Sequence, residues 1–325
     1  MPRLMNATTS EAGTFFRQRL IAHLRIARFD HSVKQIFILP GVFLAFTITG
    51  HRASLAFLWR VIVGLISATL IACSNYVINE ILDAPFDREH PVKKRRPAAC
   101  GLIHFGWGYV QWIAMMAAGM LLAATISTRF VLSAAALWVM GCIYNIPPVR
   151  SKDLPYVDVL SESINNPLRF CLGWYMVTSS ILPPVSLLVS YWMLGAYFMA
   201  LKRFSEYRQI ASPSIASSYR RSFSFYREES LLNSIIFYSA AAMLFFGAFI
   251  MRYRMELILS FPVLAWMMSV YFGLSFKDES AVQNPEKLYK EPRLMIALLV
   301  CTVVMAFLLL VRLPWLQSMF PMSTP

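Results

Sequence analysis

The sequence has 325 residues, of which 58% are hydrophobic and 14% charged, and its mean hydropathy is +0.55. Apolar runs of membrane-spanning length in such a composition exclude a soluble globular protein and indicate a polytopic helical membrane protein. The formal net charge of +13 would suit nucleic-acid binding. The basic residues gather in alternate loops, however, as the positive-inside rule predicts, so we expect no nucleic-acid partner.

About nine apolar segments of near-bilayer length are predicted to form transmembrane helices in an all-α domain. Their bounds are 35–50, 53–79, 102–126, 128–147, 158–179, 183–201, 231–251, 256–275 and 294–312. They define one transmembrane catalytic domain over 35–312, with an N-terminal segment at 1–34 and a short tail at 313–325. The loops after the second, fourth, sixth and eighth spans hold most of the Lys and Arg residues. These loops and the N-terminus are therefore predicted to be cytoplasmic.

The five cysteines show neither zinc-binding spacing nor a disulfide framework. The N-terminal segment lacks a short apolar core followed by small residues, so no cleavable signal pattern is expected. Its stretch LIAHLRIARF is compatible with an interfacial amphipathic helix or with an ordinary cytoplasmic tail.

The densest polar stretch follows the second span and reads SNYVINEILDAPFDREHPVKKRRPAACG over 74–101. Asn79 and Asp83 are four residues apart, so a helix would present them on one face. Pro85 is expected to kink or end that helix near Asp83, with Asp87 at the membrane mouth. An amide and two carboxylates suit Mg²⁺ shared with substrate phosphates, and the basic run can neutralise the remaining phosphate charge. An ordinary charged loop does not explain ionisable groups at the end of an apolar helix.

The fourth span is followed by Tyr144 and by a double-proline turn that leads into Arg150 and Lys152. Consecutive prolines hold the chain extended. The turn therefore brings a phenol, a guanidinium and an ammonium group to the predicted cytoplasmic side. Positive-inside charge alone explains Arg150 equally well.

Polar residues also interrupt the fifth span and end the sixth. Glu162, Asn166 and Arg169 share a helical face, where they either line a cavity or form a structural ion pair. At the end of the sixth span, Lys202 and Glu206 are spaced as an i, i+4 pair. The following loop, 207–230, is long enough to act as a lid or as a linker.

The motif Asn79-Glu80-x-x-Asp83-x-x-x-Asp87 resembles the first aspartate-rich motif of the UbiA superfamily of intramembrane prenyltransferases, with Glu80 where the family usually has Asp. Its continuation to Gly101 is similar to the branch that makes decaprenylphosphoryl-5-phosphoribose. The loop from Tyr144 to Lys152 also resembles a superfamily motif. Most of the superfamily has a second aspartate-rich motif after the sixth span. Here the segment is Lys202-Arg203-x-x-Glu206, which resembles the phosphoribosyl branch.

The resemblance implies a UbiA-type helical bundle with a cytoplasmic polar cap, in a bacterial inner membrane. It implies Mg²⁺-dependent transfer of a 5-phosphoribosyl group from phosphoribosyl pyrophosphate to a polyprenyl phosphate, with release of pyrophosphate. The implied metal ligands are Asn79, Asp83 and Asp87, which are also expected to be catalytic together with Lys202 and Glu206. The implied substrate-binding residues are Lys34, Lys93, Lys94, Arg96, Tyr144, Arg150, Lys152, Arg169 and Arg203.

Two alternatives remain at this point. A UbiA-type enzyme could instead move a prenyl group from a prenyl diphosphate to an aromatic or other small acceptor. The missing second aspartate motif argues against this, whereas Glu80, and Gln35 beside Lys34, depart from the phosphoribosyl pattern. A transporter is the third reading, but transport needs polar groups through the full membrane thickness, and here they crowd one end.

Overall fold

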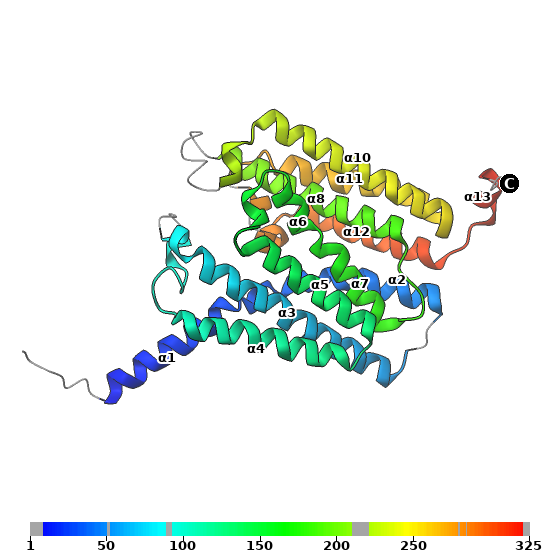
Figure 1. The fold of residues 1–325 in the computed structure, drawn as a ribbon. Helices are drawn as coiled ribbons and strands as arrows, with labels where there is room; N and C mark the ends of the chain where they lie inside the picture. The colour runs from blue at the N-terminus through cyan, green and yellow to red at the C-terminus, as the bar shows by residue number, and fades with distance from the viewer. Residues whose placement is uncertain are drawn as a thin grey trace, which may run out of the picture. The chain divides into compact units, whose positions relative to one another are not determined.

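The computed structural model describes residues 9–50, 53–88, 93–209, 221–278, 280–283 and 285–320. Every regular element in these ranges is helical, which confirms the all-α prediction (Figure 1). The chain divides into two compact units. The first unit comprises Met1–Ile36 and Leu55–Arg150, and the second comprises Phe37–Ser54 and Ser151–Pro325. The expected boundaries at 34 and 312 stay predictions.

Seven helical segments of the described residues are long and apolar enough to cross a membrane. They are Arg17–Thr49, Leu55–Asp87, Phe105–Ala124, Val185–Arg208, Glu228–Tyr253, Met255–Leu274 and Pro292–Leu310. The other two expected spans, 128–147 and 158–179, correspond to α5 and to the helix pair α6 and α7. The chain is therefore a multi-pass membrane protein, and the number nine stays a prediction.

The first unit is organised around its longest helix. Its elements are α1 (Thr9–Ile26), the 3-10 helix η1 (Phe29–Ile38), α3 (Leu55–Asp87), the 3-10 turn η2 (Lys93–Arg95), α4 (Phe105–Ala124) and α5 (Thr128–Asn145). Helix α3 packs against both α4 and α5. Small residues allow the close approach: Ser67 Oγ donates to the carbonyl of Gly119 at 2.7 Å, and Gly141 lies against the Asn75 side chain.

The second unit contains the remaining helices. They are α2 (Leu39–Thr49), η3 (Ser151–Asp153), α6 (Val157–Ser163), α7 (Asn165–Val177), α8 (Val185–Arg208), η4 (Arg221–Ser224), α10 (Glu228–Tyr253), η5 (Met255–Ser260), α11 (Phe261–Leu274), η6 (Ala281–Gln283), η7 (Pro285–Lys290), α12 (Pro292–Leu310) and α13 (Pro314–Met319). The main packed pairs are α8 with α10, α2 with α7, and α11 with α12 (Figure 1). Gly41 and Gly173 bring the backbones of α2 and α7 into direct contact.

Two prolines change the expected helix boundaries. The predicted helix end near Asp83 is wrong, because α3 continues through Pro85 to Asp87. A proline in the last turn removes only one backbone donor, and the N–H of Arg88 still donates to Ala84 at 3.3 Å. The expected continuous helix over 158–179 is also wrong, since it is interrupted at Ile164 between α6 and α7. Pro167 lacks the N–H that would bond the carbonyl four residues earlier.

Candidate active site

Asp83, near the end of α3, is bound by hydrogen bonds from two other residues of the first unit. Arg150 Nη2 donates to Asp83 Oδ1 at 2.9 Å, and Asn79 Nδ2 donates to Oδ2 at 3.2 Å. Arg150 has a φ of 32°, in the left-handed region that residues other than glycine rarely adopt. Its guanidinium also lies 5.0 Å from the ring centroid of Phe86. An unfavourable backbone conformation that delivers a cation to a carboxylate is typical of a functional site.

A chain of hydrogen bonds sets the orientation of the Asn79 amide. Asn145 Nδ2 donates to the carbonyl of Gly141 at 2.9 Å, and a carbonyl can only accept. Asn145 therefore presents its Oδ1 to Asn79 Nδ2, which donates at 2.5 Å. The Asn79 nitrogen thus serves both Asn145 and Asp83, and neither bond uses its Oδ1. Asn145 was not among the predicted site residues; the only sequence signal for it was an Asn in the last turn of an apolar helix.

Asp87 is the last residue of α3 and is 4% exposed. Arg96 Nη1 donates to its Oδ2 at 2.8 Å. Glu80, at the family position usually occupied by Asp, accepts a hydrogen bond from the backbone N–H of Ala98 at 3.4 Å. The segment after η2 is thereby attached to α3 through one charged and one backbone contact.

The described residues contain no group of three or more His, Cys, Asp and Glu side chains arranged to hold a metal ion. The oxygen atoms on α3 nevertheless suit a metal ion that is shared with a bound ligand. Asn79 Oδ1 is not used in its two bonds, and the Arg96 contact leaves Asp87 Oδ1 available. One amide and two carboxylates at spacings of four suit Mg²⁺, which usually keeps waters and shares substrate phosphates.

The other predicted residues of the first unit are more dispersed. Lys93 is half-buried and Lys94 exposed in η2, and Tyr144 is half-buried in the last turn of α5. Lys34 lies with its Nζ 5.9 Å from the ring centroid of Tyr76. Among the expected basic residues, Arg96 and Arg150 form ion pairs with carboxylates of α3.

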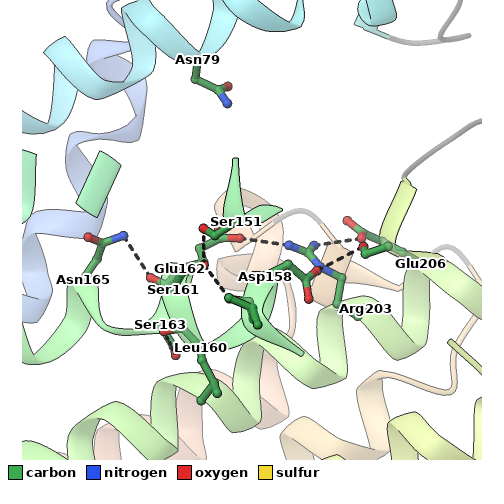
Figure 2. Close-up of polar contacts among 12 residues, drawn as sticks. Asn79, Ser151, Asp158, Leu160, Ser161, Glu162, Ser163, Asn165, Arg203 and Glu206 are labelled. Atoms are coloured by element: carbon green, nitrogen blue, oxygen red, sulfur yellow. Dashed lines mark hydrogen bonds and ion pairs between the residues drawn. The ribbon is translucent and has the colours of Figure 1, made fainter. Parts of the chain in front are cut away.

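In the second unit, the Arg203 guanidinium forms ion pairs with three carboxylates (Figure 2). Arg203 Nε contacts Asp158 Oδ2 at 2.9 Å, and its Nη2 and Nη1 contact Glu162 and Glu206 at 3.0 Å each. The Arg203 side chain is 3% exposed and that of Asp158 is fully buried. We call these four residues the Arg203 cluster. Glu206 thus forms an ion pair with Arg203, and its i, i+4 pair with Lys202 stays a prediction.

Tyr226 completes the environment of Asp158 and was not predicted. Its hydroxyl donates to Asp158 Oδ1 at 2.6 Å and accepts the N–H of Tyr156 at 2.6 Å. Burial, reinforced by the adjacent Asp158 carboxylate, raises the pKa of Tyr226, so its hydroxyl stays a donor. No local spacing connects residues 68 positions apart.

The remaining predicted residues of the second unit differ in burial. Lys152 is 5% exposed and Arg169 is 7% exposed, whereas Lys202 is half-buried. Glu162 forms an ion pair with Arg203. A cavity-lining role and a structural ion pair both stay predictions for Glu162 and Arg169. Residues 210–220 of the predicted 207–230 loop lie outside the described residues, so the lid and linker alternatives both stay predictions.

The helical fold and its apolar spans define a multi-pass membrane protein with charged groups at its helix ends. The model of the UbiA prenyltransferase family matches residues 36–299, so the chain belongs to that family. Family membership sets aside the transporter alternative. The recognition of the superfamily from the α3 motif is confirmed, whereas the phosphoribosyl branch is not tested by this match.

Solved structures with the same fold are remote in sequence. A UbiA homologue from Archaeoglobus fulgidus, bound to DMAPP and Mg²⁺, has a TM-score of 0.66 and 21% identity, covering 86% of this chain and 99% of that one. A structure described as digeranylgeranylglyceryl phosphate synthase has a TM-score of 0.60 and 13% identity, covering 90% and 96%. A homologue from Aeropyrum pernix K1 has a TM-score of 0.57 and 16% identity, covering 84% and 98%. These likenesses establish the fold.

One similar sequence is the uncharacterized protein y4nM of Sinorhizobium fredii, with 26% identity over 153 residues. The match covers 47% of this chain and 28% of that protein.

Proposed function

We propose that this protein transfers a 5-phosphoribosyl group from phosphoribosyl pyrophosphate to a polyprenyl phosphate. An oxygen of the lipid phosphate attacks C1 of the ribose, the bond from C1 to the pyrophosphate oxygen breaks, and pyrophosphate leaves. The product is a polyprenylphosphoryl-phosphoribose of the kind used in a bacterial cell envelope. The lipid phosphate is already an anion, so no enzyme nucleophile is required, and positioning with charge stabilisation provides the catalysis.

The Arg203 cluster is the observation that carries the choice of donor. A prenyltransferase with two acidic motifs needs free carboxylates after the sixth span. In this chain the acidic residue there, Glu206, contacts Arg203, as do Asp158 and Glu162. A guanidinium shared by three carboxylates occupies the position where a second aspartate-rich motif would present its carboxylates to a metal ion. This arrangement supports a site with one acidic motif and additional basic groups, as in the phosphoribosyl branch.

Asn79, Asp83 and Asp87 would hold Mg²⁺, which would shield the charge of the diphosphate as it departs. Arg96 and Arg150, which pair with Asp87 and Asp83, are placed to contact diphosphate oxygens as well. In this proposal Lys202 and Glu206 are catalytic residues that contact the reacting groups. Lys93, Lys94, Tyr144, Lys152, Arg169 and Arg203 provide further phosphate contacts or order those that do.

We also propose that these groups face the cytoplasm of a bacterial inner membrane. The basic loops support this orientation through the positive-inside rule. Phosphoribosyl pyrophosphate is a cytosolic metabolite class, so the orientation and the donor are mutually consistent.

A second candidate keeps the fold and changes the donor. The Archaeoglobus fulgidus homologue was solved with DMAPP and Mg²⁺, and with GPP and Mg²⁺. These complexes favour transfer of a prenyl group from a prenyl diphosphate to an aromatic or glycerol-type acceptor.

The test uses the full chain purified in detergent with Mg²⁺ and a polyprenyl phosphate. Pyrophosphate release is followed after addition of phosphoribosyl pyrophosphate, and the lipid product is identified by mass. We expect release that EDTA abolishes, and that Asp83→Asn lowers by at least 100-fold while the exposed loop variant Asp278→Asn retains it. Turnover only with a prenyl diphosphate and an aromatic acceptor would establish the second candidate instead.

A further inference from the structure

Tyr76 of α3 is surrounded by three residues from the segment between α1 and η1 and from η1 itself. The His31 ring lies edge-to-face on it with centroids 5.5 Å apart. The guanidinium carbon of Arg28 is 5.8 Å from the ring centroid, and Lys34 Nζ is 5.9 Å from it. All four residues belong to the first unit.

The segment is firmly attached to α3. Ala22, Ile26 and Ala27 share a buried core with Cys73 and Val77, which lie on either side of Tyr76 in the sequence. This packing brings the end of α1 alongside the part of α3 that precedes the acidic motif.

The conformation of Arg28 is unusual. Its φ is 52°, again in the left-handed region. Its N–H donates to the carbonyl of Arg25 at 3.0 Å, and its own carbonyl accepts the N–H of His31 at 2.9 Å. Arg28 Nη2 donates to His31 Nε2, which must accept because arginine has no acceptor. The backbone is thus held in a costly geometry that directs the guanidinium to the Tyr76 ring.

Neither cation forms an ion pair within the described part of the chain. Within the described residues, the Asp30 carboxylate is 3.5 Å from His31 and is 76% exposed. Glu80, one turn beyond Tyr76, accepts the N–H of Ala98 and interacts electrostatically with Arg28 without forming an ion pair with it. Two positive groups on one aromatic ring repel each other, and an anion between them would relieve the repulsion.

The distance along α3 between Tyr76 and the acidic motif sets the length that a ligand needs to reach both. Tyr76 precedes Asp83 by seven residues and Asp87 by eleven, so the two carboxylates lie about 20° to either side of it on one face of α3. The rise of the helix separates Tyr76 from Asp83 by about 10 Å. A ligand with a diphosphate at one end and a phosphate across a sugar ring spans a comparable length.

We propose that Arg28 and Lys34, held on Tyr76, form a second anion site that binds a phosphate monoester, separate from the diphosphate site at Asp83 and Asp87. The naming of its ligand rests on the proposed function. In phosphoribosyl pyrophosphate this group is the 5-phosphate, and in the acceptor it is the phosphate of the polyprenyl lipid. A prenyl diphosphate has no such second group, so binding of ribose 5-phosphate at this site would distinguish the two candidate donors.

The experiment measures ligand binding by thermal stabilisation of the full chain in detergent, without turnover. The probes are ribose 5-phosphate, a short-chain polyprenyl phosphate, and pyrophosphate with Mg²⁺. The variants are Arg28→Gln and Lys34→Gln, with Arg28→Lys to keep the charge. Arg25→Gln is the matched control, because it removes an exposed cation from the same segment.

We expect Arg28→Gln and Lys34→Gln to raise the apparent Kd of one monoester probe at least tenfold and that of Mg²⁺-pyrophosphate less than twofold. Asp83→Asn should do the reverse, and Arg28→Lys should retain most of the affinity. The probe that responds identifies the source: ribose 5-phosphate indicates the sugar phosphate and the lipid probe indicates the acceptor.

Unchanged monoester affinity in both Gln variants, with wild-type melting temperatures, would overturn the anion site even if phosphoribosyl transfer is observed. Lost affinity in those variants would support the site even if the wild-type protein forms no phosphoribosyl lipid, in which case only the proposed function fails.

Discussion

Replacing Arg203 by Met tests whether the Arg203 cluster supports the fold. The variant keeps a long apolar side chain but removes three charged contacts of 2.9 to 3.0 Å. Asp158 is fully buried, whereas the Glu162 side chain is 27% exposed and can be partly hydrated. Most of the loss therefore comes from Asp158. Removing one partner of a buried ion pair costs about 3–5 kcal/mol, and we expect that loss in the free energy of unfolding.

The measurement is unfolding in dodecylmaltoside micelles by titration with SDS, followed by far-UV circular dichroism. Arg208→Met is the matched control on the same helix, because its contact with Glu228 is 3.5 Å long and both side chains are more than a third exposed. We expect a loss below about 1 kcal/mol for this control. Arg203→Lys should lose about 1.5–3 kcal/mol, since one ammonium cannot replace a guanidinium fork with three partners.

A double variant isolates the electrostatic cause. Asp158→Asn removes the buried negative charge that Arg203→Met deprives of its guanidinium, so the double variant should be more stable than Arg203→Met alone. Equal stability of Arg203→Met and the Arg208→Met control would refute the reasoning. So would a double variant whose losses simply add.

Three further changes test other parts of the structure. Gly141→Ala should destabilise the protein by about 1–3 kcal/mol, because the new methyl group would overlap Asn75, whereas Gly247→Ala meets open space and should be neutral in the same SDS titration. Tyr226→Phe should cost about 1–3 kcal/mol, since Asp158 loses a hydrogen-bond donor. The raised pKa of Tyr226 gives stability that is fully present below about pH 10 and lost only above it, so this deficit should be constant from pH 7 to 9. Chelation of divalent metal should stop pyrophosphate release without lowering the melting temperature by more than a few degrees, and a complete loss of folded signal would contradict this.

The sequence by itself determined the class of the protein and the first acidic motif. Apolar runs report membrane-spanning helices because the bilayer requires backbone groups to be satisfied within each segment. The spacing of Asn79, Asp83 and Asp87 defines one face of a helix whatever packs against it. Both inferences depend on local geometry. The predicted end of the helix was less accurate, because α3 continues for one more turn through Pro85 to Asp87.

Only the tertiary structure decided which charged groups pair. Arg150 meets Asp83 across 67 positions, and Arg203 meets Asp158 across 45. Helical spacing predicts only the local pair of Lys202 and Glu206, whereas the structure adds Arg203, whose planar fork satisfies several carboxylates at once. The partners of a buried charge depend on the packing of distant segments and on the desolvation that this packing imposes. Neither quantity can be read from the order of residues along one helix.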